Sequence, residues 1–303
     1  RKQKGENMYT REEKTFQVCS HVIMAVMAIL CLLPFLLLII SSFTDNDAIV
    51  RNGYSLFPEK WSTAAYEYLF DRSNQTLSAY GITVLVTLLG TCGNLILTTL
   101  LAYPLSRKDM PGRAAFTFIV FFTMLFNGGL VPTYLLYTRY LCIKNTLAGL
   151  LVPSLLMNVY FVLIMRTFFQ NSIPSALIES AQIDGASEMR TFVSIVLPMG
   201  KPIIATVGLF AGIAYWNDWY NGMIYVTKSN LFSIQQLLMR MLNDIQFLQA
   251  NSSFVGAEDY ISKIPGVTVR MSIAVVGILP ILLVYPFVQN NFVKGIAIGA
   301  VKG

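Results

Sequence analysis

The sequence predicts an all-α membrane protein with six transmembrane helices and a polar loop between the fourth and the fifth. Three observations lead to this fold class. The 303 residues are 55% hydrophobic and only 13% charged, which is about half the charged share of a soluble domain. Apolar runs long enough to cross a bilayer recur along the chain. Short polar or basic segments separate these runs, as between the spans of a membrane protein.

Residues 1–20 form a polar, basic segment that we expect to be a cytoplasmic leader. Residues 22–40 are uncharged and mostly apolar, which is enough for a first span. A signal peptide has a similar composition, but no small-residue cleavage pattern follows this run. We therefore interpret it as a span, in which Pro34 produces a kink that a membrane helix tolerates.

The middle of the chain alternates between apolar runs and short polar turns. Residues 41–78 form a polar excursion whose aromatic residues suit the membrane interface. Gly128, Gly129 and Pro132 interrupt the third apolar run and loosen its backbone. We expect the second, third and fourth spans at residues 80–103, 114–138 and 145–165.

The second half contains two polar loops of unequal character. We expect the first loop at residues 170–202, the fifth span at 203–226, an extracytoplasmic loop at 227–270, the sixth span at 271–293 and a cytoplasmic tail at 294–303. No linker rich in proline or serine divides the chain, so we expect one domain with a six-span core at residues 22–293.

The loop charges indicate the orientation. If the N-terminus is inside, the inner segments hold thirteen of the 22 Lys and Arg residues, over a shorter total length than the outer loops. This modest bias places both termini and the loop 170–202 on the cytoplasmic side.

The loop 170–202 reads as two helices joined at a glycine corner, Gly185. We expect Pro174 in the first turn of the first helix, where its missing N–H costs little. Asp184 is expected to cap the second helix, and Pro198 and Pro202 to end the segment. The same local pattern would suit an amphipathic helix pair in the loop of any membrane protein.

These residues also carry a family signature, the "EAA" motif: E-A-A, three residues, G, nine residues and I-x-L-P. The matching residues are Glu179, Ala181, Gly185, Ile195 and Pro198, with Ser180 in place of the middle alanine, and with Asp184 and Ala186 completing the D-G-A core of the sugar-transporting branch. The chain therefore resembles the permease subunit of a type I ABC importer of the carbohydrate-uptake class. It looks most like the branch related to the LplC and YtcP permeases.

The resemblance implies a heterodimer with a second permease subunit, a dimer of ABC ATPases and an extracytoplasmic sugar-binding lipoprotein, in the bacterial cytoplasmic membrane. It implies that the loop forms coupling helices that dock on the ATPase, through Glu179, Ser180, Ala181, Asp184, Gly185 and Ala186. The loop 227–270 would meet the binding protein. ATP and Mg²⁺ would bind the partner ATPase, because this chain has no phosphate-binding G-x-x-x-x-G-K-[ST] loop.

Polar and aromatic residues inside apolar runs are candidates for a sugar pathway, because such side chains are costly in a membrane. They are Asn127, Tyr134, Asn158, Tyr215, Trp216, Asn217, Trp219, Tyr220 and Asn221. On one helix Trp216, Trp219 and Tyr220 would share a face, which suits a neutral polyhydroxylated solute. The alternative is an aromatic belt at the outer interface. For Asp218 we expect packing, or a salt bridge to the partner subunit.

Other functions find little support in the residues. His21 is the only histidine, and the four cysteines lack metal-ligand spacing, so neither catalysis nor a metal site is expected. The net charge of +6 is spread over short loops, which disfavours nucleic-acid binding. An ion-coupled secondary carrier should show charged relays in its spans, where only Asp218 qualifies. A permease for a peptide or phosphodiester stays an alternative, although no Arg or Lys lies in the spans to meet an anion.

Overall fold

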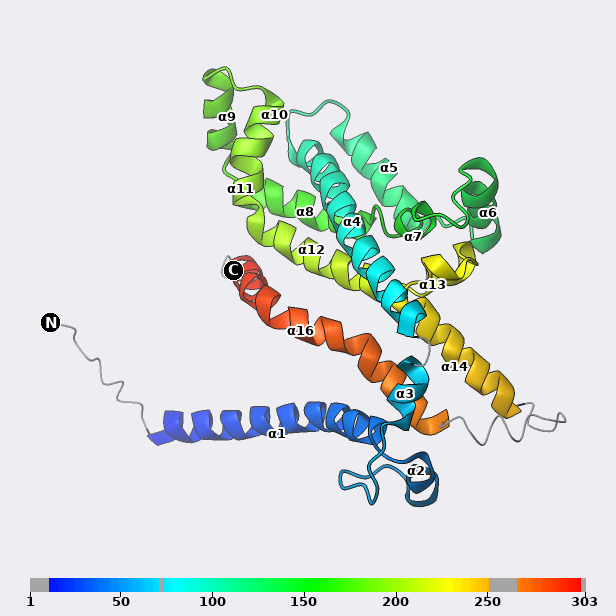
Figure 1. Cartoon of the computed structure of the whole chain (residues 1–303). Helices are drawn as coiled ribbons and strands as arrows, with labels where there is room; N and C mark the ends of the chain where they lie inside the picture. The colour runs from blue at the N-terminus through cyan, green and yellow to red at the C-terminus, as the bar shows by residue number, and fades with distance from the viewer. Residues whose placement is uncertain (1–10, 71–72, 251–265, 301–303) are drawn as a thin grey trace. The chain divides into compact units, whose positions relative to one another are not determined.

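The computed structural model describes residues 11–70, 73–250 and 266–300 (Figure 1). These residues are mainly helical, and the β-type contact found among them is an isolated bridge between Thr44 and Trp61. The all-α fold class is therefore confirmed. Residues 1–10, 251–265 and 301–303 lie outside the described part, and with them parts of the expected leader, outer loop and tail.

Two compact units make up the chain. Unit 1 comprises residues 1–71 and 245–276, and unit 2 comprises residues 72–244 and 277–303. Two helices, α14 (Ile234–Ala250) and α16 (Gly266–Ala300), contribute to both units. Helix α16 extends past the expected end of the sixth span into the expected tail.

In the described part of the chain, three helical segments are long and apolar enough to cross a membrane by themselves. They are Thr15–Ser42 in α1 (Arg11–Ser42), Gln75–Ser106 in α4 (Ser73–Ser106) and Gly266–Leu283 in α16. Three helix pairs reach the same length only across a bend: Arg113–Leu125 with Leu130–Tyr140 at 110°, Val159–Ser172 with Ser175–Ile183 at 77°, and Glu188–Met199 with Lys201–Trp216 at 78°. Six spans result only if each pair counts as one, so the number six stays a prediction.

Unit 1 joins α1 to two short helices, α2 (Asn46–Asn52) and α3 (Ala64–Phe70). The Tyr66 ring stacks on Phe43 with centroids 4.6 Å apart, and its hydroxyl lies 2.8 Å from Ser42 Oγ. Asp45 caps α2 and accepts a 2.9 Å hydrogen bond from Lys60 Nζ. This bond holds the pKa of Asp45 below its ordinary value. The described part of the expected polar excursion thus contains two short helices and the first turns of α4.

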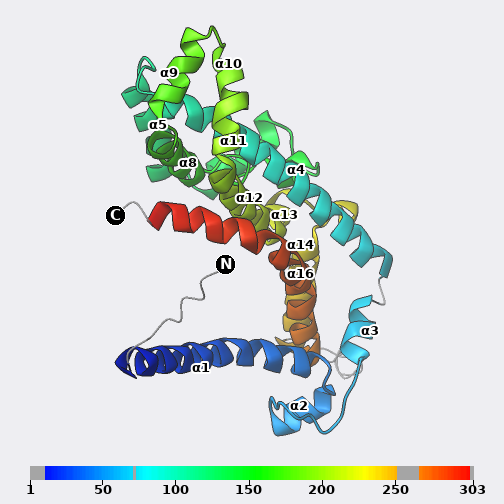
Figure 2. The ribbon, with the colours of Figure 1, turned by 90° about the vertical axis from the view of Figure 1, so that its left-hand side faces the viewer.

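Unit 2 is built around α4, which packs against α8 (Val159–Ser172) and α12 (Lys201–Trp216) (Figures 1 and 2). Its other elements are α5 (Arg113–Leu125), α6 (Leu130–Leu135), the π-helix η1 (Leu136–Tyr140), α7 (Ala148–Leu151), α9 (Ser175–Ile183), α10 (Glu188–Thr191), the π-helix η2 (Phe192–Val196), α11 (Leu197–Met199), α13 (Tyr220–Tyr225) and the short 3₁₀-helix η3 (Ser229–Leu231).

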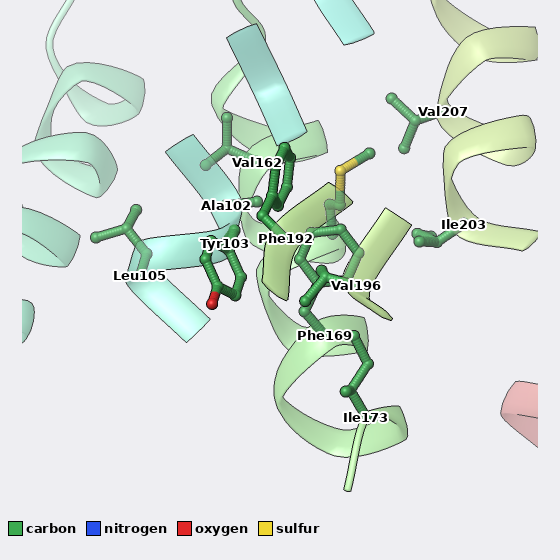
Figure 3. Packing of buried hydrophobic residues seen from close by; sticks show 11 residues of the cluster. Ala102, Tyr103, Leu105, Val162, Phe169, Ile173, Phe192, Val196, Ile203 and Val207 are labelled. Atoms are coloured by element: carbon green, nitrogen blue, oxygen red, sulfur yellow. The ribbon is translucent and has the colours of Figure 1, made fainter. Parts of the chain in front are cut away.

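The contact between α4 and α12 depends on small residues. A Cβ added at Gly208 would lie 3.2 Å from the Leu95 side chain, and one at Gly212 would lie 3.5 Å from Thr91 Oγ1. Helices in lipid gain little from hydrophobic burial, so close backbone approach at such residues is what holds them together. Where the last turns of α4 meet the first turns of α12, both helices contribute to a buried hydrophobic cluster (Figure 3).

The expected fourth and fifth spans are not continuous helices. Helix α7 ends at Leu151 and α8 begins at Val159, and α12 ends at Trp216, inside the expected fifth span. The expected outer loop 227–270 contains all of α14 and the first residues of α16. The expected break in the third span is confirmed: α5 ends at Leu125 and α6 begins at Leu130.

Candidate functional site

The loop between α8 and α12 lies at the end of unit 2 where α4 passes into α5 (Figures 1 and 2). It contains α9, a corner at residues 184–187, and a second helical stretch from Glu188 to Met199. The second stretch is anchored, because Phe192 and Val196 are buried in the hydrophobic cluster (Figure 3). The expected pair of helices around a glycine is therefore present.

Gly185 makes the corner with a left-handed backbone, at φ +74°. Its N–H donates to the carbonyl of Gln182 at 3.0 Å, and the N–H of Ala186 donates to that of Ala181 at 2.9 Å. These two bonds form a Schellman motif, which satisfies carbonyls that the end of α9 leaves free. The corner is thus fixed by hydrogen bonds within the motif itself.

Two expected details of this loop are wrong. Asp184 ends α9 and does not cap α10; Ser187 does so, with its hydroxyl accepting the N–H of Arg190 at 3.3 Å. Serine is the better-placed cap because it stands directly before the first helical residue. The second detail is Pro174, which precedes α9 as its N-cap residue and does not lie in its first turn. Pro198 and Pro202 flank the end of the segment as expected, at the 78° bend between Met199 and Lys201.

The loop exposes both polar and apolar side chains to solvent. Glu179, Ser180, Asp184 and Gly185 are exposed, whereas Ala181 and Ala186 are half-buried. Ile183 stands out, with 86% of its surface exposed at the tip of α9. Leu177 and Met189 of the same loop are also exposed, and several exposed apolar side chains on one loop favour a docking surface where a single one would not.

The pathway candidates fall into a buried group and an exposed group. In the buried group, the hydroxyl of Tyr215 donates to the carbonyl of Leu151 at 2.8 Å, and the amide of Asn221 donates to that of Pro153 at 2.9 Å. Both side chains are 2% exposed. Trp216 is 9% exposed and donates from Nε1 to the carbonyl of Gly277 at 3.1 Å.

Asn94 belongs with the buried group, although the sequence analysis did not select it. Its amide is buried in α4 and donates to the carbonyls of Leu155 and Leu156 at 2.8 and 3.3 Å. The signal in the sequence was an amide in the middle of an apolar run. Asn94, Tyr215 and Asn221 together satisfy carbonyls that the break after α7 leaves free, as a membrane interior requires.

The exposed group consists of Asn127, Asn217, Trp219 and Tyr220, of which the two aromatic residues are 37% and 45% exposed. Trp219 and Tyr220 pack edge to face, with centroids 6.0 Å apart. The expectation that they share a helix face with Trp216 is wrong, because α12 ends at Trp216 and α13 begins at Tyr220.

The remaining candidates have local roles in the backbone. Asn158 caps α8 by accepting the N–H of Tyr160 at 2.9 Å. Asp218 accepts the N–H of Asn221 at 3.1 Å, a packing contact of the kind expected. Tyr134 stacks with Tyr225, and its hydroxyl lies 3.2 Å from Lys144 Nζ. Across residues 11–70, 73–250 and 266–300 no cluster of His, Cys, Asp or Glu could hold a metal ion.

Comparison with solved structures defines the class of protein. The chain superposes with TM-score 0.76 and 29% sequence identity on a chain of a bacterial ABC transporter involved in the import of the acidic polysaccharide alginate. The match covers 94% of this chain and 99% of that one. The fold is therefore that of the membrane subunit of an ABC importer.

Sequence comparison defines the family. The chain is 37% identical to the polygalacturonan/rhamnogalacturonan transport system permease YtcP of Bacillus subtilis, over 96% of this chain and all of that one. It is 34% identical to the protein LplC of the same organism, over 97% of each chain. No protein-family model matches the chain. The chain belongs to the family of carbohydrate ABC-transporter permease subunits, which are transport components of the bacterial plasma membrane and not enzymes.

Proposed function

We propose that this permease forms one half of a heterodimeric pathway for an oligosaccharide and couples it to a separate ATPase through residues Glu179–Gly185. The single observation that supports this is the loop itself. Its corner is fixed by a Schellman motif, its second helix is anchored in the bundle, and its first helix leaves Ile183 and Glu179 exposed. A rigid element of this kind transmits motion that a flexible loop would absorb.

The arrangement requires three kinds of partner. A second permease subunit would complete the pathway, an ATPase dimer would bind ATP and Mg²⁺ and receive the loop at the cytoplasmic face, and an extracytoplasmic lipoprotein would deliver the sugar. Both termini would then be cytoplasmic, in agreement with the bias of Lys and Arg toward the inner segments.

Within the pathway we assign sugar contact to Asn127, Asn217, Trp219 and Tyr220, because their side chains are exposed. Aromatic faces stack on the C–H surfaces of sugars, and amides bind their hydroxyl groups. Tyr215, Trp216 and Asn221 would instead hold the shape of the pathway, since their polar atoms already bond backbone carbonyls. An aromatic belt at the outer interface is the competing assignment for Trp219 and Tyr220.

An acidic sugar is a second candidate cargo besides a neutral one. The proteins that this chain resembles include transporters named for polygalacturonan/rhamnogalacturonan and for alginate. Lys144 Nζ lies 3.2 Å from the Tyr134 hydroxyl and 5.9 Å from the centre of its ring. A cation beside an aromatic ring combines attraction for a carboxylate with a stacking surface.

Glu179→Lys tests the coupling assignment. The permease would be co-expressed with the proteins encoded beside its gene, and the assembled complex would be placed in lipid nanodiscs. The ATPase activity of the complex would then be measured with the binding protein and candidate oligosaccharides. In the wild type we expect hydrolysis to rise only with the binding protein and a particular sugar. In Glu179→Lys we expect both assembly with the ATPase and the stimulated hydrolysis rate to fall, each by at least about tenfold. A reversed charge at a docking surface costs more than about 1.4 kcal/mol of binding free energy.

Glu179→Gln is the matched control, because it keeps the size and polarity of the side chain. Chromatography of each complex shows whether the protein has inserted and assembled. Stimulation equal to wild type in Glu179→Lys would remove the loop from coupling, whereas a wild-type complex that responds to no sugar would contradict the carbohydrate cargo.

A further inference from the structure

We infer that Glu188, at a position that the family signature leaves unspecified, is a positioning residue that ties the coupling corner to the end of α4. This inference rests on the proposed function, because its consequence is for coupling. Glu188 is the first residue of α10, three positions after Gly185. Its carboxylate receives donors from α4, from the connection after α4 and from α9.

The bond to α4 is the shortest of these contacts. The Tyr103 hydroxyl donates to Glu188 Oε2 at 2.7 Å, across 85 positions of sequence. The Tyr103 side chain is anchored in turn, since its ring lies 5.2 Å from that of Phe192 in the buried cluster (Figure 3). A hydrogen bond to a charged acceptor is about twice as strong as a neutral one. One buried ring therefore fixes the position of the exposed carboxylate.

The second carboxylate oxygen gathers the other two donors. Gln182 Nε2 of α9 donates to Glu188 Oε1 at 3.1 Å, and an Arg107 guanidinium nitrogen lies 3.7 Å from the same atom. Arg107 is itself held by two hydrogen bonds to Asp109, at 2.9 and 2.6 Å. These bonds hold the pKa of Asp109 below its ordinary value. The positive charge of the Arg107 side chain, which is only 12% exposed, is thus held close to the Glu188 carboxylate.

The packing of α10 against this end of α4 is incomplete, although Tyr103 contacts Phe192 and Thr191 is buried. A cavity of about 410 Å³ lies between them, and its lining includes Tyr103, Arg107, Met110, Glu188 and Met189. The buried cluster fixes the lower part of the second helix through Phe192 and Val196. Nearer the corner, the hydrogen bonds of Glu188 connect α10 to α4 and to α9.

As a consequence, a displacement of α9 by the ATPase is transmitted to α4 through the Glu188 carboxylate. Without the tie, the corner could pivot over the cavity while the buried cluster stayed intact. ATP hydrolysis would then continue with less movement of α4, so less sugar would cross for each ATP. A residue that merely stabilised the fold would lower the yield of protein without changing this ratio.

Tyr103→Phe is the sharpest test, because it keeps the ring against Phe192 and removes only the hydroxyl. We would compare it with Glu188→Ala and with the double variant in the assembled complex. Two quantities would be measured: hydrogen exchange of residues 184–192, and sugar taken up per ATP hydrolysed. We expect each single variant to raise the exchange and lower the uptake ratio by about three- to tenfold, the range for one ordinary hydrogen bond, because the exposed Glu188 carboxylate is screened by solvent.

The double variant should be no worse than Glu188→Ala, because both changes break the same bond. Tyr66→Phe is the matched control, since Tyr66 also combines a stacked ring, on Phe43, with a hydroxyl bond, to Ser42 Oγ, and belongs to unit 1. It should leave both quantities unchanged.

Unchanged exchange in Tyr103→Phe, or additive effects in the double variant, would overturn the inference. So would altered exchange with a normal uptake ratio, because the tie would then be structural only. If the wild-type complex itself shows no sugar-stimulated hydrolysis, the proposed function fails, and normal exchange in the variants would still refute the tie separately.

Discussion

At position 185 one torsion angle decides whether two short helices meet at a corner. A φ of +74° lies in the left-handed region, which costs about 1–2 kcal/mol for most L-residues and little for glycine. A Cβ at this position would meet no atom within 4 Å. The requirement for glycine therefore comes from the backbone alone and not from crowding.

Substitutions at Gly185 should consequently rank by their tolerance of positive φ. Gly185→Asn should keep most of the sugar uptake per ATP, because asparagine adopts the left-handed conformation more readily than other residues with a side chain. Gly185→Val should lose most of it, because a β-branched residue would open the Schellman motif. Uptake and ATPase assays on assembled complexes check this ranking. Equal activity of the two variants would show that the corner does not depend on this angle.

The two key residues of this corner differ in how far sequence reveals them. Gly185 was predicted, because its place between two helical patterns and its local signature are visible over a few residues. Glu188 was not, because the donor that gives it a role, Tyr103, lies 85 positions away. No local pattern reports such a contact.

At the scale of whole elements, a broken span is stable only if its free carbonyls find donors. The break between α7 and α8 leaves carbonyls at Leu151, Pro153, Leu155 and Leu156, and side chains from α4, α12 and the start of α13 bond them. These donors lie in distant parts of the sequence. The conformation of the chain between α7 and α8 therefore depends on hydrogen bonds from other elements of unit 2.

Close approach of α4 to Tyr215 is part of this arrangement, and two glycines of α4 test it. A Cβ at Gly90 would fall inside van der Waals contact with the Tyr215 ring, whereas one at Gly81 would meet nothing within 4 Å. We expect Gly90→Ala to destabilise the protein by about 1–3 kcal/mol through overpacking. Gly81→Ala should be neutral or stabilising by up to about 1 kcal/mol, from helix propensity.

The measurement is the thermal midpoint of the purified complexes in nanodiscs. The two variants make the same chemical change in one helix, so any difference between them reports the Tyr215 contact. A midpoint for Gly90→Ala at or above that of Gly81→Ala would mean that α4 and Tyr215 are not in contact.

The element breaks show where prediction from sequence succeeds. The interruption of the third span was predicted, because glycines and a proline mark it directly. The break in the fourth span was missed, because mostly apolar composition continues through it. The break in the fifth span falls at Asn217–Trp219, whose polar residues were interpreted as pathway residues on one continuous helix. What allows those breaks is the set of buried amides and hydroxyls on other helices, which only the tertiary structure shows.

At the scale of the whole molecule, the candidate pathway residues divide by what their polar atoms already bond. The composition predicted all nine as one class, because an amide or an aromatic ring in a membrane is unusual in any role. The structure separates buried side chains that bond backbone carbonyls from side chains that remain exposed. The exposed ones are those that a sugar can reach, although Asn127 Oδ1 already accepts the Gly129 N–H at 2.9 Å.

Trp219→Ala and Asn221→Ala should therefore fail in different ways. Trp219→Ala removes an exposed stacking surface, so we expect the sugar concentration for half-maximal uptake to rise about tenfold, the equivalent of 1.4 kcal/mol, with an unchanged thermal midpoint. Asn221→Ala removes a buried hydrogen bond to the Pro153 carbonyl, which keeps the 2.8 Å bond from the Leu155 N–H. We expect this variant to lose about 0.5–1.5 kcal/mol of stability and to keep its sugar affinity in the protein that survives.

Titrating sugar uptake and recording thermal midpoints on the same preparations separates the two effects. Tyr220→Phe serves as the control, because it keeps the aromatic ring beside Trp219 and removes only an exposed hydroxyl. If Trp219→Ala leaves the titration unchanged, the aromatic pair belongs to an interfacial belt. If Asn221→Ala shifts the titration at a normal midpoint, the buried amide contacts sugar and the division of the pathway is wrong. Because burial is what distinguishes the two groups, the pair of measurements tests that criterion directly.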